Sequence, residues 1–193
     1  MSEPEISRRL VIVGGAGLVT LEAAQHVHQA AREEKAATGV YKPKFFNPHE
    51  YRSLVRLAGL IVPPDEKSKG AVEAGAPEFI DLLASRSEEM AAIHTGGLAW
   101  LDAQSKKRYG STFADAAPAQ QTALLDLIAY RKNEPPELAA GIRYFRWLRD
   151  MVVDAFYTSK IGMDDIGFMG NGAMKEFSVP AAAVQYALKR MPG

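Results

Sequence analysis

The sequence predicts an all-α protein: a compact bundle of about six helices, with an N-terminal helical arm and an irregular, glycine-rich C-terminal segment. Long stretches repeat apolar residues three and four positions apart, which places them on one face of a helix. No stretch shows sustained alternation of apolar and polar residues with β-branched side chains, so no sheet is indicated.

The first body helix is predicted to begin after Asn47 and to run to about residue 61. Asn47 suits the N-cap and Pro48 the first helical position, while Glu50 occupies the third. Prolines 63 and 64 end the helix. Its apolar positions share one face and are Tyr51, Leu54, Val55, Ala58 and Ile61.

Most of the later helices are also delimited by proline, serine or glycine at their ends. They are predicted at about 77–84, 87–109, from 118, 135–158 and 180–189. Gly110 ends the second of these. The segment 160–177 is rich in glycine and is predicted to be irregular.

The chain is predicted to divide into three parts. Residues 1–31 form an export signal or an N-terminal arm, residues 32–46 a linker, and residues 47–193 the helical domain. The linker is indicated by a stretch rich in charged residues and alanine, which is followed by Gly39 and Pro43.

Composition excludes several classes of function. The chain has 23 basic and 23 acidic residues, so no basic excess favours nucleic acid as a partner. Cysteine is absent, which excludes disulfides, iron–sulfur ligation, thiolate catalysis and c-type haem attachment. The longest apolar run, 10–21, is shorter than the roughly twenty residues that a membrane-spanning helix needs.

The N-terminal segment has three interpretations. Ser7 followed by the pair Arg8 and Arg9 and a modest apolar stretch indicates a twin-arginine export signal. Glu22 and the lack of a small-x-small cleavage site depart from that pattern. The segment could instead be an amphipathic helix that packs on the body or on a partner.

The third interpretation is a dinucleotide fingerprint, because a short apolar run leads into Gly15-Ala16-Gly17. The third glycine of that motif is Thr20 here. No second apolar strand with an acidic end follows about twenty residues later. These departures argue against an independent nucleotide-binding oxidoreductase.

No set of residues indicates catalysis, and no catalytic, cofactor-binding or metal-ligating residue is predicted in this chain. His26 and His28 are two positions apart and so point to different sides of a helix, whereas helical metal ligands are three or four apart. His49 is expected to be exposed and His94 to be packed or capping. Adjacent acidic pairs do not converge on one substrate. The chain also lacks a nucleophile elbow and a phosphate-binding loop.

Five sequence segments, in their order and spacing, resemble the gluconate 2-dehydrogenase subunit 3 family over about residues 45–178. They are Ile61-Val62-Pro63-Pro64-Asp65, then 70–81, then Tyr109-Gly110-Ser111-Thr112-Phe113 with Pro118-Ala119-Gln120-Gln121, then Phe145-Arg146-Trp147-Leu148-Arg149 with Phe156-Tyr157-Thr158-Ser159, and Ile166-Gly167-Phe168-Met169-Gly170-Asn171.

The resemblance implies an accessory subunit that is not itself catalytic. Its partner would be a large flavoprotein of the glucose–methanol–choline oxidoreductase type, which binds FAD and oxidises a sugar or related hydroxyl. A multihaem cytochrome c is a further expected partner. The resemblance also implies twin-arginine export to the periplasm, which Arg8 and Arg9 fit.

A permanent partner interface is expected to be large and fairly apolar. The glycine-rich segment from residue 160 is predicted to form part of it, or else to fold back over the bundle. The aromatic residues of the helix predicted at 135–158 are either core or partner contacts. They are Tyr144, Phe145, Trp147, Phe156 and Tyr157. The predicted interface residues are Phe156, Tyr157, Ser159, Phe168, Met169, Gly170 and Asn171.

Overall fold

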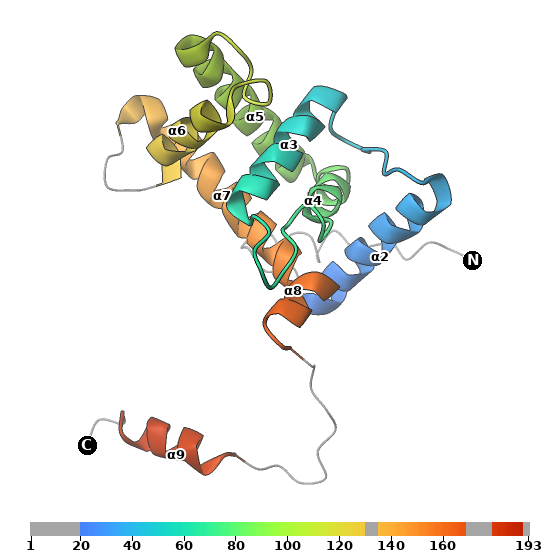
Figure 1. Cartoon of the computed structure of the whole chain (residues 1–193), viewed down its shortest axis with the longest axis vertical. Helices are drawn as coiled ribbons and strands as arrows, with labels where there is room; N and C mark the ends of the chain where they lie inside the picture. Colours follow the sequence, from blue (N-terminus) through green and yellow to red (C-terminus); the bar gives the residue numbers. More distant parts are fainter. Residues whose placement is uncertain (1–19, 130–134, 169–178, 191–193) are drawn as a thin grey trace.

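The computed structural model describes residues 20–129, 135–168 and 179–190, and within these ranges every regular element is helical. Figure 1 shows a bundle of crossing helices, with α9 apart from it. The predicted all-α bundle is confirmed. The helices are α2 (Leu21–Thr38), α3 (Pro48–Ile61), α4 (Ala76–Ala84), α5 (Glu88–Tyr109), α6 (Pro118–Ala129), α7 (Ala139–Tyr157), α8 (Lys160–Asp165) and α9 (Ala181–Leu188), with a 3₁₀ turn, η1 (Pro136–Leu138), before α7.

Several helix ends follow from local sequence. The Asn47 side chain accepts from the backbone N–H of His49 and Glu50, and the Glu50 side chain accepts from the N–H of Asn47. This reciprocal capping box fixes the start of α3, as the sequence predicts. Ser87 caps α5 in a similar way, and Gly110 ends it.

The shortest of the central helices, α4, forms the middle of the fold. All nine of its residues are buried. It contacts α2, α3, α5 and α7, so it has neighbours on every side. Phe79 and Ile80 are fully buried there. Burial of each such side chain contributes about 1.5–3 kcal/mol to folding.

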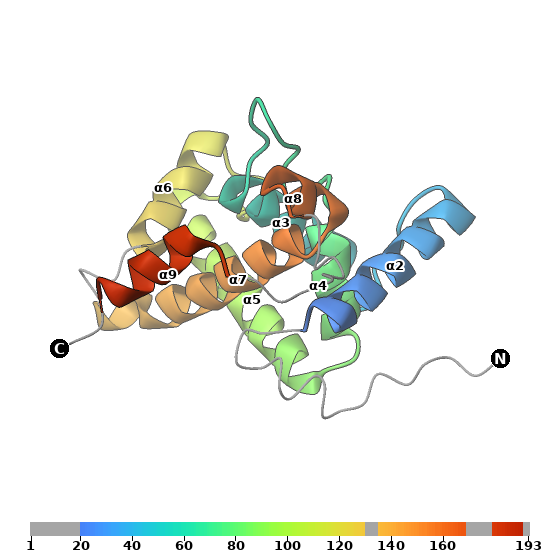
Figure 2. The same cartoon turned by 90° about the horizontal axis from the view of Figure 1, so that it is seen from below.

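The long helix α7 forms the other half of the core. It packs against α3, α4, α5, α6 and α8, and Figure 2 shows it crossing the bundle from beside α6 towards α4 and α8. Its buried face comprises Ile142, Tyr144, Phe145, Leu148, Met151, Val152 and Phe156. The aromatic residues of this helix are therefore mainly core.

The N-terminal region differs from the predicted arm and linker. Helix α2 runs unbroken across residue 31, which the sequence placed at the boundary between them. Its Ala24, Val27 and Ala31 are buried in the main core. In the rest of the expected linker, Tyr41 and Phe46 are also buried. Residues 21–46 thus pack as part of the body, because regularly spaced apolar residues outweigh the charged composition.

Candidate functional site

The corner between α7 and α8 is built by the serine that separates them. The Ser159 hydroxyl donates to the carbonyl of Phe156 at 2.6 Å and accepts from the backbone N–H of Gly162 at 3.0 Å. It therefore caps α8 while closing the last turn of α7. Both hydrogen bonds are buried, which fixes the direction in which the chain leaves α7.

Close packing at this corner requires glycine at position 162. A Cβ added to Gly162 would lie 2.1 Å from the carbonyl oxygen of Phe156. That atom belongs to the backbone and cannot move aside cheaply. Helix α8 therefore lies directly on the end of α7, although its sequence has low intrinsic helix propensity.

The N-terminal helix is joined to the same corner through His28. The Thr158 hydroxyl donates to the carbonyl of Asp154 at 2.6 Å, and the His28 imidazole lies 3.2 Å from that hydroxyl oxygen. Because the hydroxyl proton is used on Asp154, the imidazole donates from Nε2. Burial, with a smaller contribution from Arg32, lowers the pKa of His28 to about 4. The imidazole is therefore neutral at pH 7.

The end of α8 has a glycine-dependent exit. Gly167 has φ 66°, its N–H bonds to the carbonyl of Asp164, and the N–H of Phe168 bonds to the carbonyl of Met163. This is the Schellman arrangement, in which a left-handed residue satisfies the last helical carbonyls. The segment predicted to be irregular from residue 160 is thus helical over Lys160–Asp165 and leaves that helix through a defined turn at Gly167.

Three apolar side chains at and after this corner are exposed, and we refer to them together as the corner surface: Tyr157 at the end of α7, and Ile166 and Phe168 after α8. Their exposed fractions are 41%, 58% and 44%. The hydroxyl groups of the buried Ser159 and the partly buried Thr158 hold the backbone next to Tyr157. Exposed aromatic side chains are frequent anchors of protein contacts.

The predicted interface residues separate into three groups. Tyr157 and Phe168 lie in the corner surface. Phe156 and Ser159 are only 2% and 1% exposed, so their side chains build the corner and do not present a contact. Met169, Gly170 and Asn171 lie outside the described residues, as do Arg8 and Arg9. Ile166 was not predicted as an interface residue. It is exposed just after the end of α8, a helix that the sequence did not predict.

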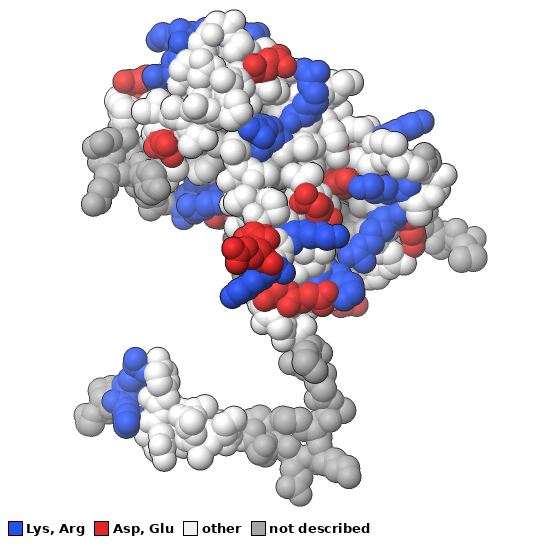
Figure 3. Space-filling view, viewed as in Figure 1, with Lys and Arg blue, Asp and Glu red and all other residues white. Residues whose placement is uncertain are grey.

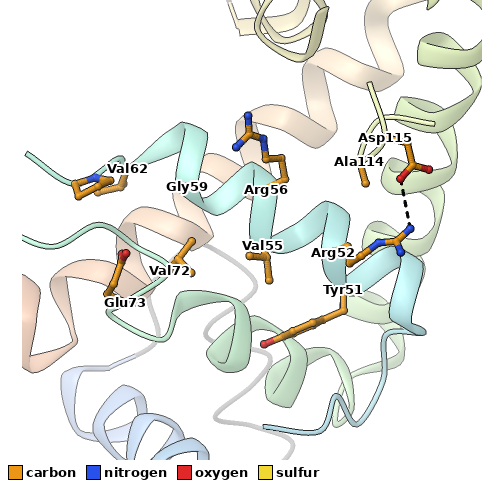
Figure 4. A pocket seen from close by; sticks show the side chains of 11 residues that line it. Tyr51, Arg52, Val55, Arg56, Gly59, Val62, Val72, Glu73, Ala114 and Asp115 are labelled. Atoms are coloured by element: carbon orange, nitrogen blue, oxygen red, sulfur yellow. Dashed lines mark ion pairs between the residues drawn. The ribbon is translucent and has the colours of Figure 1, made fainter. Parts of the chain in front are cut away.

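A groove along α3 is the second candidate surface (Figure 4). It has a volume of about 800 Å³ and lies between α3, the segment around Val72 and Glu73, and the loop at Ala114 and Asp115. Tyr51, Val55, Gly59, Val62 and Val72 supply its apolar lining.

Charged side chains at the groove are tied to the loop that follows α5. Arg52 pairs with Asp115 at 3.6 Å, and both groups are more than half exposed. The Arg56 Nε donates to Gln121 at 2.5 Å, and Gln121 in turn donates to the carbonyl of Phe113 at 2.8 Å. The buried Gln121 thus explains why a glutamine pair follows the Tyr109–Phe113 segment.

Asp102 reinforces this loop from α5. Its carboxylate accepts from the backbone N–H of Phe113 at 2.9 Å and contacts the His49 imidazole at 2.5 Å. His49 is therefore half-buried and paired, which corrects the expectation that it is exposed. His49 lies within the capping box, in the first turn of α3, and from there its side chain reaches Asp102 of α5.

His94 lies in the core, as predicted for a packed histidine. It is fully buried and surrounded by the rings of Phe46, Tyr144 and Trp147. Burial lowers its pKa to about 3, so it is neutral at pH 7. Its contact with the Tyr144 hydroxyl is long, at 3.4 Å.

Comparison with known proteins identifies the family. The model of the family described as gluconate 2-dehydrogenase subunit 3 matches residues 48–174, which include the groove, Tyr157, Ile166 and Phe168. The chain belongs to this family. Members are subunits of multi-subunit dehydrogenases, which implies a catalytic partner subunit. Neither the curated proteins nor the solved structures give a match to this chain.

The described surface has mixed charge. Figure 3 shows lysine and arginine interspersed with aspartate and glutamate over the visible face of the bundle. Within residues 20–129, 135–168 and 179–190, no three acidic or histidine side chains are placed to hold a metal ion. No helix in these ranges has the length and apolar character needed to span a bilayer.

Proposed function

We propose that this chain is the non-catalytic small subunit of a periplasmic, FAD-dependent sugar, polyol or glycoside dehydrogenase. It binds a catalytic flavoprotein of the glucose–methanol–choline oxidoreductase type, with FAD held in that partner. It assists the folding of the flavoprotein and its export by the twin-arginine pathway. A multihaem cytochrome c is a further partner in this proposal.

The observation that carries the proposal is the family match over residues 48–174. The corner surface supports it, because Tyr157, Ile166 and Phe168 offer apolar contact area without any rearrangement of the core. Such side chains are frequent anchors of protein interfaces. Export is supported by Arg8 and Arg9, which follow Ser7 and precede an apolar stretch.

Co-expression tests the partner. This chain would carry the only affinity tag and be produced with a flavoprotein oxidoreductase encoded beside it. Flavin absorbance and dye-linked oxidation of a panel of sugars would be measured on the purified material. We expect the flavoprotein to co-purify with activity, and the tagged chain alone to be colourless and inert.

Two other results would overturn the proposal. A chain that is yellow or active by itself would support an independent oxidoreductase that uses the glycines at 14–17. A chain that purifies alone and colourless, although the flavoprotein is present and folded, would support a scaffold role without a dehydrogenase partner.

Export has its own test. Replacement of Arg8 and Arg9 by lysine keeps the charge but removes the receptor-read pair. We expect the flavoprotein to move from the periplasmic to the cytoplasmic fraction, while complex formation is retained. Arg32→Lys, on the exposed side of α2, is the matched control and should leave the distribution unchanged. An unchanged distribution in the double variant would exclude export through this pair.

A further inference from the structure

Helix α9 is apolar, yet none of its residues is buried. Val184, Tyr186 and Leu188 are 41%, 63% and 61% exposed. In Figure 1 the helix lies apart from the bundle. An isolated helix shorter than about 12–15 residues is marginal in water, and α9 has eight. A covering surface would therefore stabilise both the helix and its apolar side chains.

The helix has two distinct faces. At 100° per residue, Ala181, Val184 and Leu188 lie within about 60° of one another and form an apolar stripe. Tyr186 lies on the opposite face, and Gln185 borders the stripe. Lys189 and Arg190 follow the end of the helix. This spacing matches the anchors that amphipathic helices insert into apolar grooves.

The residues that follow the end of α9 are basic. The Arg190 guanidinium lies 3.8 Å from the ring centroid of Tyr186 and covers that ring. Residues 179–190 contain Lys189 and Arg190 and no acidic residue. A complementary surface would therefore combine an apolar groove with carboxylates at its rim.

The contact area that α9 can offer decides which kind of partner could cover it. Eight helical residues extend about 12 Å, so one face offers only a few hundred Å². A stable separate interface buries at least about 1,200 Å². Contact through α9 alone is therefore too small for a dimer of two copies of this chain. It suits an extension of a larger interface.

The corner surface provides the starting point for such an extension. The described body ends at Phe168, within that surface, and residues 169–178 lead from it to Val179. Ten residues reach at most about 35 Å, so α9 can contact the same partner that covers Phe168. Helix α9 also lies beyond residue 174, where the family match ends.

We propose that α9 is a tethered docking helix for the catalytic partner subunit, an inference that rests on the proposed function. It inserts Val184 and Leu188 into an apolar groove of the partner, with carboxylates near Lys189 and Arg190. The contact adds to the region covered by the family match, since α9 lies beyond residue 174.

The test measures affinity for the purified flavoprotein encoded beside this chain. The variant combines Val184→Ala with Leu188→Ala, which removes apolar area and keeps helix propensity. We expect the dissociation constant to rise at least tenfold. Tyr186→Ala, on the opposite face of the same helix, is the matched control and should change it less than twofold.

Each remaining outcome is decisive. If the full chain binds the flavoprotein and the Val184/Leu188 variant binds equally well, the docking helix is excluded and the proposed function stands. If the full chain does not bind, the proposed function fails. If the variant binds the flavoprotein normally but loses sedimentation with anionic phospholipid vesicles, α9 contacts a membrane surface, and the docking proposal is overturned.

Discussion

The ring of Tyr144, in α7, packs directly on Gly97, in α5. A Cβ added to Gly97 would lie 2.1 Å from that ring, so the aromatic ring occupies the space of the missing side chain. The relationship is reciprocal, because the Trp100 ring of α5 covers Gly141 of α7 at a comparable distance. Two glycines thus allow the two longest helices of the core to approach closely.

Gly97→Ala is therefore expected to destabilise the fold by about 2–4 kcal/mol, because overpacking in a buried helix contact forces side chains and backbone apart. The neighbouring Gly96 is exposed, and nothing lies within 4 Å of its added Cβ. Gly96→Ala should stabilise the protein by about 0.5–1 kcal/mol through helix propensity. Urea unfolding of both variants measures the two changes in stability, which should have opposite signs. Equal effects would contradict the close contact between Gly97 and the Tyr144 ring.

A second prediction concerns Asp81, which joins α4 to the segment before α3. Its buried carboxylate accepts from the Tyr41 hydroxyl at 2.7 Å and from the backbone N–H of Lys44, Phe45 and Phe46 at 2.6, 3.1 and 3.0 Å. Asp81→Ala leaves these donors without their acceptor and should cost about 3 kcal/mol or more in the free energy of unfolding.

Tyr41→Phe is the control for this network, since it removes one donor and keeps the ring. Its expected cost is about 1 kcal/mol, because the carboxylate keeps its three backbone partners. Burial and the Asp81 contact raise the pKa of Tyr41 above its usual range, so the hydroxyl remains a donor at alkaline pH. Guanidinium unfolding measures both costs. A larger loss of stability in Tyr41→Phe than in Asp81→Ala would exclude this assignment of roles.

Local signals in the sequence predicted much of the fold. The cap at Asn47, the stop at Gly110 and the start at Pro118 all depend on neighbouring residues and are found where expected. The features that the sequence did not predict depend on contacts between segments that are not adjacent in sequence. Asp81 in an apolar helix gives no sequence sign of its partners at 41–46, and α8 forms because Ser159 and Gly162 fit the end of α7.

The candidate site was partly predicted for the same reason. Aromatic residues near 156 indicated a contact, but the sequence alone does not say which side of the corner each occupies. The turn at Ser159 buries Phe156 and exposes Tyr157. Adjacent helical residues point about 100° apart, so one position decides between core and surface.

Stability should fall with acid because His28 is buried in its neutral form. The pKa of His28 is about 4 in the folded state, against 6.5 for a solvated histidine, which the unfolded chain approaches. Between these values the unfolded chain binds a proton that the folded chain does not. The free energy of unfolding therefore falls as pH drops from about 6.5 to 4, by up to about 1.4 kcal/mol per pH unit. His94 adds a similar dependence.

His28→Gln should reduce the slope of stability against pH, since one of the two groups that take up a proton on unfolding is removed. The contribution of His94 remains. Urea unfolding at several values between pH 4.5 and 7 gives the slope for each variant. His26→Gln is the matched control, because His26 lies on the exposed side of the same helix. A slope that stays the same in His28→Gln would mean that His28 does not titrate on unfolding.

The corner surface should affect binding without affecting folding. Tyr157→Ala combined with Phe168→Ala removes two exposed rings, so the free energy of unfolding should change by less than about 1 kcal/mol. If these rings are anchors in the partner interface, the dissociation constant for the flavoprotein should rise by tenfold or more. Leu127→Ala, which removes a side chain of similar exposure on α6, is the control and should leave affinity unchanged. Isothermal titration separates binding from stability. Unchanged affinity in the double variant would place the interface elsewhere, with the α3 groove as the next surface to test through Val55→Asp.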